Sequence, residues 1–232
     1  MQLFFIHNIL IRILNKYPDL VNMGIYYELV YNYRPHILST SIHKAHILIQ
    51  VEPEGLEQLL IEISQISSNK PTSITILLNS KDDVLSLLQQ YFKIINAAGG
   101  IVTKSNQILM IYRAHTWDLP KGRIENGEAT INAAIREVHE ECSVKAVATA
   151  KFYTTWHAFQ VNRINMLKET TWYTMNCIDD THMTPQKEEG IDRVAWIGIN
   201  QLAPVLENTY ASVRLLLQAY QNHIKLTKTL DY

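Results

Sequence analysis

The chain of 232 residues has little cysteine and carries almost no net charge. Its two cysteines, Cys142 and Cys177, are too few for a disulfide framework, and no CxxC spacing or Cys/His cluster indicates zinc. The formal net charge is −1 and no segment is strongly basic, so the sequence predicts no nucleic-acid partner. A reducing cytoplasm is the simplest compartment for such a chain.

Long hydrophobic runs are also absent. The most apolar stretch, residues 1–14, is too short to span a bilayer, and it lacks the basic start and the small-residue cleavage site of a signal peptide. We interpret residues 1–23 as an extension, either an amphipathic helix docked on the protein or a poorly ordered segment. Met23 could serve as an alternative translation start, which would make the extension an artefact. No membrane partner is expected.

Nearly half of the residues are apolar, which is enough for a sizeable core. Residues 24–95 alternate between strand-like and helix-like patterns and predict a small α/β domain of unknown role. The expected strands are residues 26–33, 45–51 and 73–78, and the expected helices are residues 55–66 and 82–95, with capping candidates at residues 80–83. Residues 52–54 look like an ordinary turn. This segment shows no phosphate-binding glycine loop, catalytic dyad or metal spacing.

A second domain is predicted over residues 96–232. It begins with a small-residue strand at 97–102, a hairpin turn at 104–106 and a strand at 107–113. Further strands are expected at residues 151–159, 168–177 and 194–197, where aromatic and β-branched residues are frequent, and a helix is expected at 201–224.

The most informative stretch is residues 117–144. Pro120, Gly122 and the pair Asn126-Gly127 indicate a loop, and helical spacing of apolar residues predicts a helix over residues 130–142. Glu137, Glu140 and Glu141 stand at positions i, i+3 and i+4, so their carboxylates project from one side of that helix. Three anions so close together favour a bound hard cation such as Mg²⁺. The alternative is a solvated acidic face with an Arg136–Glu140 ion pair.

These residues match a known pattern. Gly122, Glu128, Arg136-Glu137-Val138, Glu140-Glu141 and Val144 stand at the spacing G-x5-E-x7-R-E-U-x-E-E-x-G-U, where U is apolar, and this resembles the Nudix box. The one departure is Ser143 in place of the last glycine. That position ends the helix and often needs a left-handed backbone, which costs a non-glycine residue roughly 1 kcal/mol. The resemblance implies an α/β fold, a Nudix-type α/β/α sandwich with a mixed sheet, preceded here by the small α/β domain.

The resemblance also implies an activity. Nudix hydrolases cleave a phosphoanhydride bond in a nucleoside diphosphate linked to another group, with metal-assisted water. By position, Glu137, Glu140 and Glu141 match the metal-binding glutamates, with the Gly122 carbonyl as an additional ligand and Mg²⁺ or Mn²⁺ as the ion. Glu128 and Arg136 match the supporting ion pair, which orients the helix and the loop.

The general base stays open, because the family uses either a box glutamate or an acidic residue in a later loop. In the loop at residues 186–190, Glu189 is the first candidate and Glu188 the second; Glu137 or Glu140 could serve instead. Substrate phosphates are expected to meet cations beside the box, which are Lys121, Arg123 and, from the preceding strand, Arg113.

Two classes of function fit this sequence. The Trp-x-Leu-Pro-Lys-Gly lead-in resembles hydrolases of dinucleoside polyphosphates and diphosphoinositol polyphosphates, which favours an enzyme of the pyrophosphatase type. The alternative is a nucleotide-sensing or scaffold protein whose Nudix domain binds a ligand while the N-terminal domain contacts a partner. A third interpretation is that the N-terminal domain only provides a homodimer surface. The enzyme is favoured because all three metal-binding glutamates are present and no helix-turn-helix is recognisable.

Overall fold

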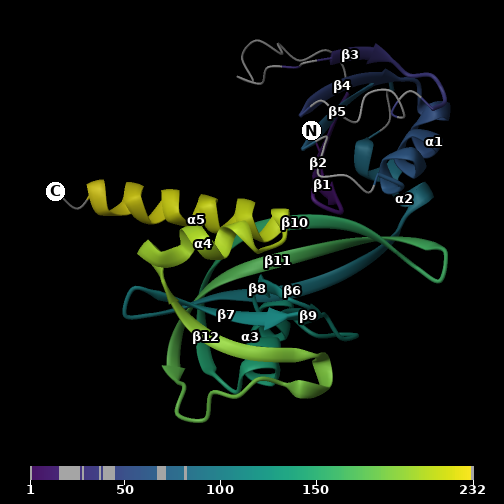
Figure 1. The fold of residues 1–232 in the computed structure, drawn as a ribbon. Helices are drawn as coiled ribbons and strands as arrows, with labels where there is room; N and C mark the ends of the chain where they lie inside the picture. Colours follow the sequence, from purple (N-terminus) through teal and green to yellow (C-terminus); the bar gives the residue numbers. More distant parts are fainter. Residues whose placement is uncertain are drawn as a thin grey trace. The chain divides into compact units, whose positions relative to one another are not determined.

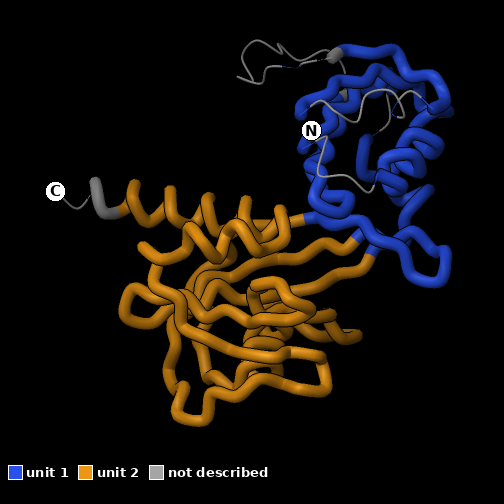
Figure 2. Tube along the Cα trace, viewed as in Figure 1, with its two compact units in different colours: residues 1–94, 156–167 blue, residues 95–155, 168–232 orange. Residues whose placement is uncertain are grey.

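The computed structural model describes residues 2–15, 27, 29–36, 38, 45–66, 72–80 and 83–230. The chain divides into two compact units, residues 1–94 with 156–167 (unit 1) and residues 95–155 with 168–232 (unit 2), as Figure 2 shows. Unit 1 therefore takes in the first residues of the chain and the end of a long hairpin from the second half. Met23, proposed as an alternative start, lies outside the described residues.

Unit 1 is built on a mostly parallel sheet with the strand order β1-β2-β5-β4-β3. Strands β1 (Gln2–Ile6) and β2 (Ile9–Asn15) form an antiparallel hairpin, and β2 pairs in parallel with β5 (Ser73–Leu78). Strand β5 pairs with β4 (His46–Val51), and β4 pairs with β3 (Leu29–Asn32), both in parallel. At the other edge, Phe5 and Ile6 of β1 pair with His157 and Ala158.

Helices α1 (Pro53–Ser64) and α2 (Val84–Tyr91) cover one face of this sheet (Figure 1). Alternate strand residues, such as Ile11, Ile13, Ile47 and Ile74, pack with the helices in one core cluster. Leu14, Leu48 and Leu77 are buried on the opposite face. Because both faces of the sheet are buried, its strands are continuously apolar rather than alternating.

The expectation for residues 1–23 is wrong for residues 2–15, the part of this segment that the structure describes. They form neither a helix nor a poorly ordered extension but two strands of the sheet, joined by a turn at His7 and Asn8 in which His7 has φ of 52°. Phe4, Ile11 and Ile13 have no exposed surface. A strand buried on both faces has no period-two pattern, so the apolar run resembled a helix.

The other elements of unit 1 agree with the predictions in part. Strand β5 has the expected bounds and β4 begins one residue late, whereas β3 covers only the end of the expected strand; Tyr26 and Glu28 lie outside the described residues. The expected turn at residues 52–54 is wrong, because Pro53 opens α1 and Glu52 is its N-cap. Asp83 caps α2 as expected, whereas Lys81 and Asp82 lie outside the described residues. Helix α2 ends at Tyr91, and the chain then enters a strand.

Unit 2 has a mixed sheet with the order β12-β7-β6-β11-β10. Strands β6 (Lys93–Lys104) and β7 (Gln107–Arg113) form the expected hairpin, and Ser105 and Asn106 both have positive φ at its turn. Strands β10 (Lys145–Val161) and β11 (Ile164–Asp179) are longer than predicted, and β12 (Ile191–Gly198) pairs antiparallel with β7.

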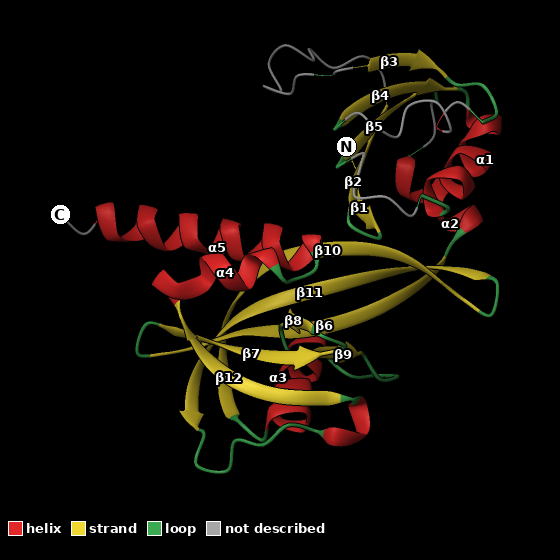
Figure 3. Ribbon diagram, in the orientation of Figure 1, coloured by secondary structure: helices red, strands yellow, loops and turns green. Residues whose placement is uncertain are grey.

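Helices cover both faces of this sheet, which confirms the α/β/α sandwich (Figures 1 and 3). Helix α3 (Thr130–Cys142) packs on one face in a cluster with Val102, Leu109 and Ile111. Helices α4 (Leu202–Glu207) and α5 (Ala211–Leu230) pack on the other, with Ile101, Ile108 and Met110. The single helix expected at residues 201–224 is therefore two helices. None of the described helices is long and apolar enough to cross a lipid bilayer.

Candidate active site

The approach to α3 is not the simple loop that its composition predicts. It contains two short strands, β8 (Thr116–Asp118), which pairs with β7, and β9 (Lys121–Arg123), which pairs with β6. A Cβ on Gly99 of β6 would lie 2.6 Å from Lys121 Cβ and from the Pro120 carbonyl oxygen. Glycine at this position is what lets the stretch lie directly on the sheet.

Helix α3 has the predicted bounds and buries Ala133, Ala134, Val138 and Cys142 against the sheet. It ends at Ser143, whose φ of 53° and ψ of 31° are left-handed, and the Ser143 N–H donates to the His139 carbonyl at 2.8 Å. The left-handed helix end that the Nudix box assigns to glycine is therefore present here with serine. The departure from the pattern affects backbone strain and not a charged group.

Arg136 holds the acidic groups of the site in one network. Its Nε and Nη2 donate to the two oxygens of Glu128, both at 2.9 Å, and its Nη1 donates to Glu137 at 2.8 Å and Glu140 at 2.9 Å. Its Nη2 also donates to the Arg123 carbonyl at 2.9 Å. One guanidinium thus connects the loop to the helix, and its hydrogen bonds, together with one from the Glu125 N–H, lower the pKa of Glu128 to about 2.

The Glu137 carboxylate is seated on Gly122. A Cβ at residue 122 would lie 2.1 Å from Glu137 Cδ, so no residue except glycine leaves room for the carboxylate where it is. Burial raises the pKa of Glu137, opposed by the hydrogen bond from Arg136. The absence of a side chain at Gly122 of β9 is therefore what lets the Glu137 carboxylate of α3 lie against it.

Glu141 faces a second group of charges, which comes from β7, β8 and β9. Its side chain is 3% exposed and accepts a hydrogen bond from the Lys121 N–H at 2.9 Å, with Arg113 Nη1 at 3.8 Å. Burial raises the pKa of Glu141 to about 7, while Lys121 and Arg113 act in the opposite direction. Arg113 and Lys121, two of the three expected phosphate-binding cations, thus lie beside one glutamate of the box.

Two charged residues of this group were not predicted. Asp118 is 2% exposed and forms ion pairs with Lys121 and, at 3.7 Å, with Arg113. Lys168 of β11 interacts electrostatically with Lys121, Asp118, Arg113 and Glu141, and burial is the main cause that lowers its pKa. Asp118 follows Trp117 within the box approach and was visible in the sequence as an acid two residues before Pro120. Nothing local marks Lys168, which the sheet brings from a distant strand.

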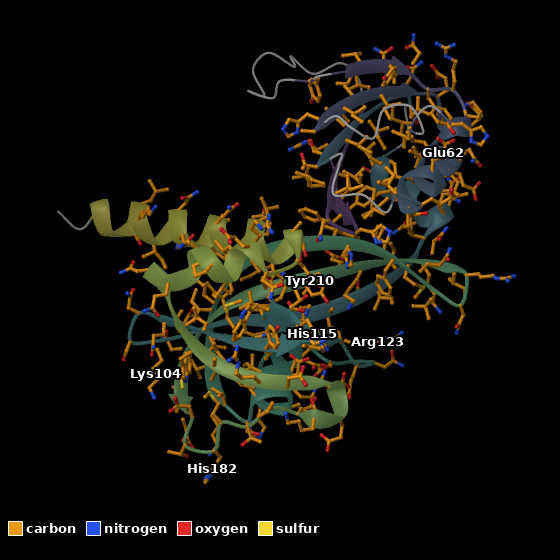
Figure 4. The ribbon with its side chains drawn as sticks, in the orientation of Figure 1. Glu62, Lys104, His115, Arg123, His182 and Tyr210 are labelled. Atoms are coloured by element: carbon orange, nitrogen blue, oxygen red, sulfur yellow. The ribbon has the colours of Figure 1, made fainter. Side chains whose placement is uncertain are left out.

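The third expected cation, Arg123, is placed differently. Its side chain is exposed (Figure 4). Its carbonyl accepts the hydrogen bond from Arg136 Nη2. Whereas Lys121 is within the buried charge group, Arg123 lies at the solvent-exposed end of β9.

The later acidic loop is tied to the end of α3. The Thr184 N–H donates to the Cys142 carbonyl at 3.0 Å and the Gln186 N–H donates to the Glu141 carbonyl at 3.1 Å. The loop then forms a short 3-10 turn, η2 (Lys187–Glu189), in which Glu188 and Glu189 are exposed. The charge of Glu189 contributes to the raised pKa of Glu137, so this carboxylate lies within electrostatic reach of the box.

The donor set suits a hard divalent cation, because Glu137, Glu140 and Glu141 offer carboxylate oxygens from one helix. In this structure one oxygen of each carboxylate accepts a hydrogen bond, from Arg136 for Glu137 and Glu140 and from the Lys121 N–H for Glu141. Within the ranges that the structure describes, no three His, Cys, Asp or Glu side chains are arranged to hold a metal ion together. Metal binding by the three glutamates together would therefore require at least one of these side chains to reorient.

A family comparison identifies the domain that carries these residues. The model of the NUDIX domain matches residues 93–219, which is more than half of the chain, and the chain belongs to the Nudix family. Nudix hydrolases generally use divalent metal ions and act on nucleotide-containing substrates.

Curated relatives match a short part of the chain. A Bacillus subtilis (strain 168) protein whose proposed activity is that of an 8-oxo-dGTP diphosphatase is 42% identical over 53 residues, 22% of this chain and 36% of that protein. The RNA pyrophosphohydrolase of Bartonella tribocorum (strain CIP 105476 / IBS 506) is 39% identical over 46 residues, 20% of this chain and 27% of that protein. The matched regions thus span about a third of the curated relatives' length.

Solved structures resemble the chain over a longer region. A NUDIX hydrolase from Nitrosomonas europaea has a TM-score of 0.46 at 17% identity, and the match covers 56% of this chain and 90% of that hydrolase chain. A Caenorhabditis elegans Ap4A hydrolase has a TM-score of 0.43 at 19% identity and covers 56% of this chain and 98% of its own.

Proposed function

We propose that this chain is a divalent-metal-dependent pyrophosphohydrolase that cleaves a phosphoanhydride bond in a nucleoside diphosphate derivative. The observation that carries the proposal is the meeting of two charge groups. The glutamates of α3 offer oxygen ligands for a cation, and Arg113 and Lys121 stand beside them at Glu141. Phosphate groups need both, because the metal ion and the cations together neutralise the charge on a diphosphate.

Each residue has a distinct part in this proposal. Glu137, Glu140 and Glu141 would hold Mg²⁺ or Mn²⁺, with the Gly122 carbonyl beside them, and the ion would supply charge neutralisation and an acidified water. Arg136 and Glu128 fix the loop on the helix. Arg113 and Lys121 bind the phosphates, and Arg123 meets the more exposed part of the substrate.

For proton transfer we propose Glu189 as the general base. The loop bonds to the end of α3 bring η2 to the box, and the charge of Glu189 acts on Glu137. An exposed carboxylate on a short loop can approach a water molecule at the metal site. Glu188, its neighbour in the same turn, is the matched control.

The substrate class that we propose is a dinucleoside polyphosphate or a related polyphosphate. Support comes from the Trp117-Asp118-Leu119-Pro120-Lys121-Gly122 lead-in, which contains Lys121 and whose Asp118 forms an ion pair with Arg113. The names of the curated relatives widen the set to test, since one is that of an RNA pyrophosphohydrolase and the other refers to an oxidised nucleoside triphosphate.

The test is a hydrolysis panel with Mg²⁺ or Mn²⁺. It contains dinucleoside polyphosphates, nucleotide sugars, ADP-ribose, ordinary and oxidised nucleoside triphosphates, 5′-triphosphate RNA and diphosphoinositol polyphosphates. We expect metal-dependent turnover of one class, lost in Glu140→Gln and strongly reduced in Glu189→Gln but not in Glu188→Gln. If the wild-type protein binds a nucleotide but turns over no compound of the panel, the hydrolase proposal is refuted and the nucleotide-sensing function is favoured.

A further inference from the structure

The buried aspartate beside the box has no place in the function proposed so far. Asp118 is the last residue of β8 and is 2% exposed. A carboxylate so deeply buried is costly unless cations and hydrogen-bond donors surround it. Asp118 has both: its Oδ1 accepts from the Leu119 N–H at 2.8 Å, and its Oδ2 accepts from Lys121 Nζ.

Asp118 is shared between two cations from different strands. Lys121 Nζ comes from β9, and Arg113 Nη2, from the end of β7, lies 3.7 Å from the same Oδ2 atom. In the β7–β8 register, Asp118 stands opposite Ile111, two residues before Arg113. The contact with Arg113 is therefore a diagonal one, which only this register provides.

Lys121 and Arg113 keep N–H donors that a ligand can use. A lysine ammonium has three N–H donors, and here Asp118 and the Leu119 carbonyl, at 3.5 Å, take two of them. The side chain of Lys121 is only 14% exposed, and that of Arg113 is 31% exposed. Two cations with little freedom therefore present their remaining donors beside Glu141, whereas Asp118 is too buried to contact a ligand.

We propose that Asp118 is a positioning residue that directs the Lys121 ammonium and the Arg113 guanidinium toward the substrate phosphate. This inference rests on the proposed hydrolase function, but the quantity that it predicts directly is the affinity for a diphosphate. It predicts whether the loss of the Asp118 carboxylate strengthens or weakens the binding of a diphosphate. A carboxylate that only lies near the cations repels an anionic ligand, so its removal would strengthen binding, whereas removal of a positioning carboxylate weakens binding.

The test measures binding of methylene diphosphonate, a diphosphate analogue with a non-hydrolysable bridge, by calorimetry with Mg²⁺. Asp118→Asn keeps the size of the side chain and an acceptor for the Leu119 N–H. We expect its Kd to be about tenfold larger than that of the wild type, which corresponds to the loss of roughly one charge-assisted hydrogen bond. In a Lys121→Met background the same substitution is expected to weaken binding less than twofold, because the main group to be positioned is gone.

A matched control comes from the same unit. Asp180 accepts from Lys104 Nζ at 2.7 and 2.8 Å, and Figure 4 shows Lys104 well separated from Arg123 of the box. Asp180→Asn thus removes another lysine–aspartate pair and should leave the Kd unchanged. If Asp118→Asn does not fold, Asp118→Glu, which keeps the charge but moves the carboxylate by one methylene, is measured instead, with weaker binding again expected.

Two results would overturn the inference. One is tighter or unchanged binding in Asp118→Asn, and the other is equal weakening with and without Lys121, as a general disturbance of the loop would produce. Because the readout is binding, a wild type that hydrolyses nothing would refute the proposed enzyme and leave this test intact. With an active wild type, kcat/KM should fall in parallel with the binding.

Discussion

Gly122→Ala separates the role of this glycine in activity from any role in stability. The new Cβ would lie 2.1 Å from Glu137 Cδ, whereas ordinary contact begins at 3.4 Å, so the carboxylate must move by about 1.3 Å. The carboxyl group is the end of a flexible side chain, so this movement costs little folding free energy. A shift of about 1 Å at a catalytic group can cost on the order of 100-fold in rate.

We therefore expect Gly122→Ala to lower kcat/KM by about 10 to 100-fold while its thermal midpoint stays within about 2 °C of the wild type. The comparison is Gly99→Ala, whose Cβ would lie 2.6 Å from the backbone oxygen of Pro120 and 2.7 Å from Trp172 Cζ3. Those neighbours cannot turn away, so this variant should lose about 1 to 3 kcal/mol of stability.

The assay is turnover of the substrate found in the hydrolysis panel, together with calorimetric melting of both variants. An alanine at residue 122 that leaves kcat/KM unchanged would refute the argument, since the Glu137 carboxylate would then not be needed where the structure places it. A fall in thermal midpoint as large as that of Gly99→Ala would refute the separation of activity from stability.

Three further outcomes are expected. Ser143→Gly should raise the stability by up to about 1 kcal/mol, seen in the melting temperature, because it relieves the left-handed backbone; an unchanged melting temperature would show that no strain is stored there. The Glu128 carboxyl has a pKa of about 2 in the folded state, below its ordinary 4.5, so its contribution to stability is complete above about pH 4.5 and is lost as the pH falls toward 2. An NMR titration should show this, and Arg136→Met should raise the pKa toward 4.5 without restoring it fully, because the Glu125 N–H still donates to Glu128. A chain that starts at Met23 would lack β1 and β2, and we expect it to lose cooperative unfolding of unit 1 in hydrogen exchange; protection of β5 as in the full chain would contradict this.

Local patterns were sufficient for much of unit 2. Helix α3, strand β7 and the Ser105-Asn106 turn have their predicted positions, since helical spacing, strand composition and turn residues act over a few neighbours. The spacing of the box also placed Glu128, Arg136 and Glu137 on one helix and its approach. The structure joins these three through hydrogen bonds of 2.8 to 2.9 Å. Their roles in catalysis stay a prediction.

Unit 1 shows where local reasoning fails. The sequence of residues 1–14 indicates a helix or an extension because its few polar residues follow no clear period, whereas the parallel pairing of β2 with β5 makes residues 9–15 a strand. The helix expected to reach residue 95 ends at Tyr91 for a similar reason, since the following residues enter β6. Pairing partners far away in the chain decide such cases, and no short window contains them.

The spacing of charges and glycines in the box was enough to indicate the family, and helical periodicity was enough to indicate which helix carries the glutamates. The burial of Asp118 between Arg113 and Lys121, and the approach of Lys168 from β11 to the same group, became visible in the folded chain alone. The reason is physical. Spacing along a helix places neighbouring side chains, whereas burial and the pairing of distant strands determine which charges share one site.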